Sequence, residues 1–380
     1  MLKIPGKIPI IISPLFWVLA LLIGWINTST FPGTLLWAAI ILGSVLIHEF
    51  GHALTALAFG QQAQIELVAL GGVTKREGGR MKLWKEFLVV LNGPLAGLCL
   101  SGTAWVAYQF LLKIHPQSLL TYVAMITFYV NLFWTILNLL PVQPLDGGKL
   151  LSIFLESIFG LKGTKIALFI SVLLSAALGI FFMIVQEFFV GALFMLFTFE
   201  GYKSWKESLA ISDDDRNPAL QQLLNEAHND LQNHREPAAL DKLLRIRKAS
   251  KTGIIHQTAT ENAAHLLADQ GFAKPAYDML TELGKQISPE GLILQHQLAY
   301  GLAYWKEAVG LGDRVYHRFP HYQIAMMNAA SHATLGNVKP AVGWIQSAIH
   351  DGLPDLQEAL EHHAFDAIRN DPLFRRLSEQ

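Results

Sequence analysis

The sequence predicts an all-α membrane protein of six transmembrane helices with a small membrane-associated β-hairpin or sheet, followed by a soluble all-α domain. Hydrophobic residues make up 52% of the 380-residue chain and charged residues only 16%, whereas charged residues are roughly 25% of a typical soluble domain. The imbalance is confined to the first half, where long apolar runs lie between Ile8 and Phe199. From Ser212 onward the composition is that of an ordinary soluble protein, so two domains of different class are expected.

The apolar runs define the predicted spans, since a transmembrane helix needs about 20 predominantly apolar residues. The last run, Ile166–Phe199, has 34 residues. At about 1.5 Å per residue it would reach roughly 51 Å, well beyond a hydrocarbon core of about 30 Å. The polar pair Gln186-Glu187 near its middle predicts a tight hairpin that divides it into two helices. The six expected spans are Ile8–Ile26, Thr34–Phe59, Glu86–Leu112, Ser118–Leu140, Ile166–Val185 and Phe188 to about Trp205.

The basic residues beside these runs predict the orientation of the helices. Twelve Lys and Arg residues flank the ends on one side of the predicted bundle, and only Lys113 flanks the other. Because Lys and Arg accumulate on the cytoplasmic side, both termini are expected in the cytoplasm, with the core in a bacterial-type cell membrane. Lys3 and Lys7 precede the first run as they would in a signal peptide, but no small-residue cleavage pattern follows, so this helix is expected to be retained.

Three ionisable residues stand close together in the second apolar run, as His48-Glu49-Phe50-Gly51-His52. On a helix, positions i and i+4 share a face, so His48 and His52 can hold one ion and Glu49 can reach its bound water. This is the H-E-x-x-H arrangement of zinc hydrolases, in which Zn²⁺ lowers the pKa of the water and Glu accepts its proton. Each ionisable group at span depth costs roughly 2.5–3.5 kcal/mol, which disfavours the alternative of a passive polar helix contact.

Asp146 is the expected third ligand of the metal, because a catalytic zinc needs three protein ligands and an open position. It is the only carboxylate between Glu86 and Glu156, and the prolines and glycines around it break the helix. Irregular backbone at membrane depth is tolerated only where it faces protein or a water-filled cavity. Taken alone, Asp146 would be read as part of an Asp-Gly-Gly turn at the end of a span. Cys99 is the single cysteine, so a disulfide framework is excluded and a cysteine metal site is not indicated.

These segments resemble the site-2 proteases, a family of intramembrane zinc metalloproteases. The resemblance covers about the first 205 residues and rests on the H-E-x-x-H segment and on the N-x-x-P…D-G segment from Asn138 to Gly147. It implies that His48, His52 and Asp146 bind one Zn²⁺ per chain and that Glu49 is the general base. The implied reaction is hydrolysis of a peptide bond within or beside a transmembrane segment of a membrane protein substrate.

Two further segments are similar to features of that family. In "NGPLAG", which begins at Asn92, a small-xxx-small pattern lets helices approach closely, and Asn92 fits either an oxyanion donor or a packing residue. Residues 63–74, "AQIELVALGGVT", predict a short strand or hairpin near Gly71 and Gly72. Its counterpart in relatives is a sheet thought to receive substrate, because an exposed strand edge would pair with an unwound helix. A plain structural hairpin is the alternative. Asn138 completes the candidate substrate or oxyanion residues.

The expected domains are a protease core at residues 1–211, a linker at 212–217 and a cytoplasmic helical domain at 218–380. A weak repeat in the last part resembles the tetratricopeptide pattern of helix pairs about 34 residues long, and a generic helical bundle is the alternative. Such repeats would present a surface to a cytoplasmic protein or peptide partner. The repeated positions are Ala276, Ala308 and Ala341, then Gly271, Ala303 and Gly336 five residues before them, and Pro289, Pro320 and Pro354 after them.

The class of function indicated is therefore an enzyme, a zinc metalloprotease that works among membrane lipids. A catalytically inert, membrane-anchored binding module that recruits partners through the repeats is the alternative, and the complete set of ligands and base argues against it. A metal transporter is disfavoured because the first and fifth predicted spans contain no charged residue. The net charge of −1 indicates no nucleic-acid partner.

Overall fold

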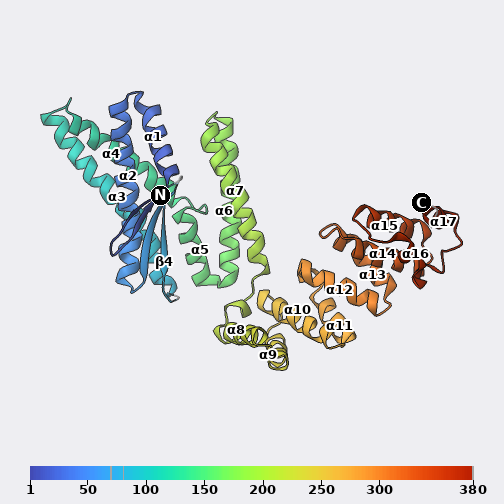
Figure 1. Ribbon diagram of the computed structural model, residues 1–380. Helices are drawn as coiled ribbons and strands as arrows, with labels where there is room; N and C mark the ends of the chain where they lie inside the picture. Colours follow the sequence, from blue (N-terminus) through green and yellow to red (C-terminus); the bar gives the residue numbers. More distant parts are fainter. Residues whose placement is uncertain (69–70, 80, 379–380) are drawn as a thin grey trace. The chain divides into compact units, whose positions relative to one another are not determined.

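The computed structural model describes residues 1–68, 71–79 and 81–378 and separates into two compact units, Met1–Leu209 and Ala210–Gln380 (Figure 1). Each unit has hydrophobic clusters of its own. The division falls within two residues of the end of the core expected at residue 211. The units are described separately below.

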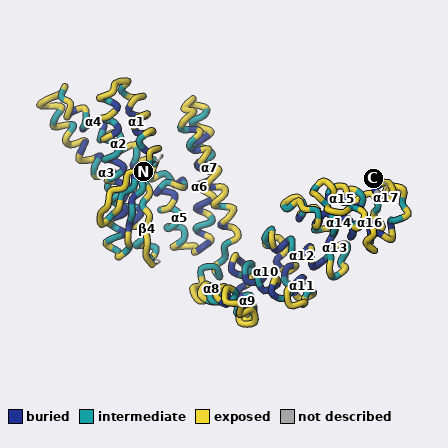
Figure 2. The backbone as a smooth tube through the Cα atoms, in the orientation of Figure 1, coloured by how far each residue is buried: buried dark blue, intermediate teal, exposed yellow. Residues whose placement is uncertain are grey.

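The first unit contains seven described α-helices. Four of them, α2, α3, α4 and α6, are long and apolar enough to cross a membrane, judged by length and composition. They correspond to four of the six expected spans, within a few residues at each end. Exposed residues run along these helices (Figure 2), and they include large apolar ones such as Phe110, Phe133 and Leu173. Such exposure suits a lipid-facing surface. The helices are α1 Pro14–Thr28, α2 Phe31–Ala58, α3 Leu83–Ile114, α4 Leu119–Leu139, α5 Asp146–Phe159, α6 Leu161–Ile184 and α7 Phe188–Ala210.

The first expected span, Ile8–Ile26, is wrong as a single helix. Its beginning forms a strand, and α1 starts only at Pro14 after an extended Ser13 with φ −72° and ψ 145°. Proline in a helix interior removes a hydrogen bond and clashes with the preceding turn, and the residue before a proline favours extended backbone. Pro9 and Pro14 therefore exclude a continuous helix here. The 15 residues of α1 reach roughly 22 Å, less than the hydrocarbon core of about 30 Å.

The predicted hairpin between the last two helices is present. Helix α6 ends at Ile184, and Gln186 adopts a left-handed conformation with φ 66° before α7 begins at Phe188. Helix α5, in contrast, was not predicted as an element. Helix α5 is short, has one apolar face and lies between the longer α4 and α6 in the chain. Its sequence therefore contains no apolar run long enough to predict a span.

A four-stranded sheet accompanies the helices. The strands are β1 Leu2–Ile4, β2 Ile10–Ile12, β3 Gln62–Val68 and β4 Gly71–Glu77, in the order β1-β2-β3-β4. The β3–β4 pair is antiparallel, with Ile65 opposite Thr74, and confirms the predicted hairpin. Strand β2 pairs parallel to β3, with Ile10 opposite Ile65. Strand β2 was missed because its isoleucines were assigned to the first span, and β1, which precedes that span and has three residues, was not predicted either.

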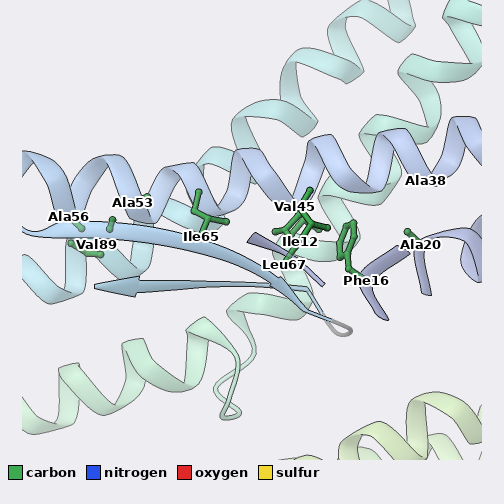
Figure 3. Close-up of a cluster of buried hydrophobic side chains, with 11 residues drawn as sticks. Ile12, Phe16, Ala20, Ala38, Val45, Ala53, Ala56, Ile65, Leu67 and Val89 are labelled. Atoms are coloured by element: carbon green, nitrogen blue, oxygen red, sulfur yellow. The ribbon is translucent and has the colours of Figure 1, made fainter. Parts of the chain in front are cut away.

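The sheet and α1 share the surface of α2. Phe16 of α1 packs beside Val45 near the middle of the helix, whereas Ile65 of β3 lies towards Ala53 further along it (Figure 3). Ile65 is fully buried, and burial of such a side chain contributes about 1.5–3 kcal/mol. Ile12 of β2 and Leu67 of β3 lie beside Val45 (Figure 3). The sheet therefore lies along α2 from about Val45 to Ala53, the stretch that contains His48.

The second unit consists mainly of four successive helix hairpins. In each one, a left-handed residue ends the first helix, with φ between 56° and 85°, and an alanine five residues later is fully buried. Three of these pairs are the repeat positions read from the sequence. The fourth, His234 with Ala239, was missed because His234 is not small. The helices of the second unit are α8 Pro218–Gln232, α9 Glu236–Ala249, α10 Ile254–Asp269, α11 Ala273–Leu283, α12 Pro289–Gly301, α13 Trp305–Tyr316, α14 Tyr322–Thr334, α15 Val338–His350, α16 Leu356–Glu361 and α17 Pro372–Ser378. The tetratricopeptide assignment stays a prediction.

Candidate metal centre

The H-E-x-x-H segment lies within α2 and is buried. His48, Glu49 and His52 are respectively 4%, 4% and 8% exposed. Because a helix repeats every 3.6 residues, the two imidazoles stand one turn apart on the same face, with their Nε2 atoms 3.2 Å from each other. The helix therefore delivers two nitrogen atoms to one point, as expected.

Asp146 comes to the same point from the first position of α5. Its Oδ2 lies 3.0 Å from His48 Nε2 and 3.1 Å from His52 Nε2. Asp146, which is 98 and 94 positions from the two histidines, thus joins them in a compact group of three ligand atoms that could hold a metal ion. The three edges of this triangle, 3.0, 3.1 and 3.2 Å, differ little.

The donor set fits a zinc ion. Tetrahedral bonds of about 2.0–2.1 Å place neighbouring ligand atoms roughly 3.3 Å apart, close to the triangle observed. The ring of His52 is oriented by its Nδ1, which donates to the carbonyl of Val89 at 2.8 Å, so Nε2 is the nitrogen with a free lone pair. A carboxylate that is charged only accepts hydrogen bonds. Acceptor atoms that converge in this way are best satisfied by a cation, and three protein ligands leave a tetrahedral position open.

The loop before Asp146 is held by close backbone packing. A side chain on Gly147 would collide with the carbonyl of Leu139, and one on Gly148 would lie 2.6 Å from the backbone of Gln143. The N–H of Gln143 donates in turn to Ser171 Oγ of α6 at 2.7 Å. Only glycine fits at these two positions, so the Asp-Gly-Gly sequence is the condition for Asp146 to reach the histidines.

Glu49 faces the sheet. Its Oε2 accepts a hydrogen bond of 2.6 Å from Thr74 Oγ1 on β4. A Cβ on Gly72 of the same strand would lie 2.6 Å from both Cδ and Oε1 of Glu49. Because Gly72 and Thr74 are two apart, they present the same face of the strand. Strand β4 thus orients the carboxylate and lies directly against it.

A cavity of about 170 Å³ surrounds these groups. It has room for several water molecules, and its walls come from α2, α3, α4, β4 and the beginning of α5. Gly71, Gly72 and Asn138 line it, so three of the four predicted substrate or oxyanion candidates lie at the cavity. Lys149 also lines it, with Nζ 3.5 Å from Asp146 Oδ1.

Asn92 does not line this cavity. Its side-chain amide donates to Thr55 Oγ1 of α2 at 2.8 Å, beside the point where the backbone of Asn92 meets Gly51. Of the two roles that fit Asn92 in the sequence, this contact supports packing. Asn138 lies at the cavity, and its amide donates to the carbonyl of Trp134 within its own helix at 3.0 Å.

Three residues that contact the ionisable groups of the site were not singled out in the sequence. Thr74 could have been found, because its strand position places it on the face of Gly72. Val89 contributes only a backbone carbonyl, which no side-chain pattern signals. Lys149 follows Asp146 by three residues, and this spacing brings side chains together on a helix, but only once the start of α5 is known.

The chain is similar to known metalloproteases over its first half. The profile of peptidase family M50 matches residues 36–116 and 111–182. Stage IV sporulation protein FB of Bacillus subtilis is 35% identical over 142 residues, which are 37% of this chain and 45% of that protein. A shorter protein of Methanocaldococcus jannaschii, provisionally named a zinc metalloprotease, is 32% identical over 143 residues, or 32% of this chain and 73% of its own length.

The matched region is limited in extent. The chain spans less than half of the Bacillus relative and a third of a Synechocystis protein that also carries a provisional zinc metalloprotease name, at 35% identity over 128 residues and 33% of this chain. Among solved structures, a site-2 protease from Methanocaldococcus jannaschii aligns with 53% of this chain and 94% of its own chain, at 22% identity and a TM-score of 0.40.

Proposed function

Because the chain belongs to peptidase family M50, we propose that it is an intramembrane zinc endopeptidase that cuts a membrane protein within or beside a transmembrane segment. Membership of this family confirms the resemblance to the site-2 proteases. The observation that carries the proposal is the meeting of His48, His52 and Asp146 around one point, with Glu49 beside them in a cavity.

The residues of the chain divide the chemistry among them. Zinc, when bound by the two histidines and Asp146, supplies a Lewis acid that polarises a carbonyl and makes water more acidic. Glu49 is the general base: Thr74 occupies its Oε2, so Oε1 is the oxygen left to take a proton from a water in the cavity. The Val89 carbonyl keeps the proton of His52 on Nδ1. The 170 Å³ cavity admits the water that hydrolysis consumes.

Strand β4 is the proposed docking edge for the substrate. It is the last strand in the order β1-β2-β3-β4, so its outer edge has no partner strand among the described residues. A transmembrane helix must unwind before its peptide bond can be attacked, and freed backbone groups inside a membrane need partners. Addition of the unwound segment to β4 supplies them and places it next to Gly72 and Glu49.

The arrangement in the membrane belongs to the same proposal. Six apolar helices cross the membrane in this proposal: the four long ones, α7, and α1, whose 15 residues reach roughly 22 Å and are accommodated by local thinning of the bilayer. Both termini then lie in the cytoplasm, in agreement with the basic residues on that side. The four helix hairpins of the second unit then lie in the cytoplasm, where they bind a protein or peptide partner. Insertion of a reporter that works only in the cytoplasm after Gln380 and at Lys113 tests this topology, and activity at Lys113 would contradict it.

The catalytic proposal is tested with purified protein and a membrane-embedded peptide substrate. Glu49→Gln should keep one zinc ion per chain and lose cleavage, because the ligands remain and the base is gone. His48→Ala and Asp146→Ala should lose both. Glu187→Gln, in the turn between α6 and α7, is the matched control and should change neither. Cleavage by Glu49→Gln at the wild-type rate would contradict the mechanism.

A further inference from the structure

We propose that Thr135 positions His48 through a bridging water molecule, which is held in the space that Gly97 leaves open. The inference rests on the proposed zinc centre. Its starting point is an asymmetry between the two histidines. His52 has a partner for its outer nitrogen, the carbonyl of Val89. His48 Nδ1 is equally buried, yet it has no hydrogen-bond partner among the residues that the structure describes.

Thr135 of α4 has an unsatisfied group of the same kind. Its residue is 3% exposed, and its Oγ1 is buried without a partner in the described part of the chain. Threonines in the other helices behave differently: Thr34 and Thr55 donate to the carbonyl four residues earlier, at 2.8 and 2.7 Å. The hydroxyl of Thr135 does not donate to the carbonyl four residues earlier, so it remains available to hydrogen-bond another group.

Gly97 of α3 connects these two observations. A Cβ at Gly97 would lie 3.0 Å from Thr135 Oγ1 and 3.9 Å from His48 Nδ1. The two unsatisfied atoms therefore flank the same small space, which exists because residue 97 has no side chain. Helix α3 thus passes close to both the histidine and the threonine at Gly97, where a side chain would lie against both atoms.

A histidine that binds a metal needs a hydrogen-bond acceptor at its second nitrogen, and the space beside Gly97 can hold one. A histidine that binds a metal through one nitrogen almost always donates its other N–H to a carboxylate, a carbonyl or a water, which fixes the ring and raises its basicity. Because Nε2 of His48 belongs to the group of proposed metal ligands, its lone pair is used by the metal and Nδ1 carries the hydrogen. A water seated over Gly97 accepts it and donates to Thr135 Oγ1, so it has two polar partners and stands next to the hydroxyl.

The test measures zinc affinity of the full-length protein against a competing chelator, with the visible absorption of the cobalt-substituted protein as a second readout. Thr135→Val keeps the shape and removes the hydroxyl, and should weaken zinc binding by about 10- to 100-fold. Thr135→Ser keeps the hydroxyl and should bind as the wild type does. Gly97→Ala fills the space and should resemble Thr135→Val. Thr121→Val removes another buried hydroxyl of α4, far from the site in sequence, and should have no effect.

The outcomes separate this inference from the proposed function. Equal zinc affinity and equal cobalt spectra for Thr135→Val and wild type would overturn the role of Thr135 and leave the zinc centre intact. Equal losses in Thr135→Val and Thr135→Ser would also overturn it, since packing alone would then explain them. Absence of zinc binding by the wild type would instead overturn the proposed function. The Val and Ser pair decides the question even if Gly97→Ala does not fold.

Discussion

At the scale of single residues, the site depends on glycines as much as on its ionisable groups. Gly72 brings β4 so close to Glu49 that a methyl group would overlap the carboxylate side chain. Gly147 and Gly148 allow the backbone after Asp146 to pack closely against the backbone of Leu139 and Gln143. Residues of this kind contribute nothing to the chemistry themselves, but they set the distances at which the other residues meet.

Gly72→Ala should therefore abolish most of the proteolysis while zinc stays bound. The added Cβ would lie 2.6 Å from Oε1 of Glu49, so the base must move, and a misplacement of about 1 Å can cost on the order of 100-fold in rate. Cleavage rate and zinc content of the purified variant are the measurements. Gly79→Ala is the matched control, because a Cβ there meets nothing within 4 Å. Activity of Gly72→Ala equal to that of this control would show that Glu49 does not need its observed position.

A buried histidine in the second unit predicts a pH dependence of stability. His296 is fully buried and bonds to Asn328 Oδ1 at 2.8 Å. Burial lowers its pKa below 6.5, and the bond to Asn328 opposes this only in part. The unfolded chain therefore takes up a proton first as the pH falls. Stability of the second unit should be constant above about pH 6.5 and fall below it, by at most about 1.4 kcal/mol per pH unit for this group.

The measurement is denaturant unfolding of the second unit between pH 5 and 8, values at which an ordinary histidine titrates. Because His332 also has a lowered pKa, the informative quantity is the difference between wild type and His296→Gln. That difference should shrink as the pH falls. His362→Gln, on an exposed residue, is the control and should leave the pH dependence unchanged. A pH-independent difference for His296→Gln would contradict the prediction.

At the scale of elements, the site is placed by the crossing of α2 and α3. A side chain on Gly51 would collide with the backbone of Asn92, and the Asn92 amide bonds to Thr55 one turn further along α2. The crossing brings Val89 of α3 to His52. Small residues thus let two helices approach until a backbone carbonyl can orient a metal ligand.

Two alanine substitutions in α2 should have opposite effects on thermal stability. Gly51→Ala forces the helices apart, and overpacking of this kind costs about 1–3 kcal/mol. Gly43→Ala, in the same helix, meets nothing within 4 Å and should stabilise the helix by up to about 1 kcal/mol, the difference in helix propensity. Thermal unfolding in one detergent compares them directly. Equal shifts for both variants would mean that the close crossing does not limit stability.

An element could be predicted where its residues form a continuous pattern in the sequence, such as a long apolar run or a motif. The four long helices each have a run of apolar residues, so composition alone locates them. Residues 10–12 are equally apolar but form a strand, and a short apolar strand cannot be told from a helix by hydrophobicity. Only Pro9 and Pro14 indicated that a helix could not be continuous here. The metal group was predictable because each ligand lies in a recognisable motif. The hydrogen bond from His52 to Val89 and the position of Thr135 near His48 were not predictable, because both depend on how helices cross.

At the scale of the whole molecule, the segment expected to be a linker belongs structurally to the second unit. Ser212 Oγ donates to the carbonyl of Thr252 at 2.8 Å, and the N–H of Ile255 donates to Asp215 Oδ1 at 2.6 Å. Residues 214–216 form a turn of 3-10 helix. The acidic run thus accepts a hydrogen bond from the first turn of α10, although its composition is that of a flexible linker.

Removal of zinc should destabilise one unit only. Each unit has its own hydrophobic clusters, and the three metal ligands all lie in the first. A ligand stabilises the state that binds it, by about 2.7 kcal/mol when its free concentration is 100 times its dissociation constant. Two thermal transitions are therefore expected in calorimetry. A chelator should lower the transition assigned to the membrane unit and leave the other unchanged. His48→Ala identifies the affected transition, because it should melt like the chelated wild type and not respond to the chelator. A single transition would show that the units unfold as one. Equal movement of two transitions would show that metal loss also destabilises the helical hairpins, and either result would contradict the prediction.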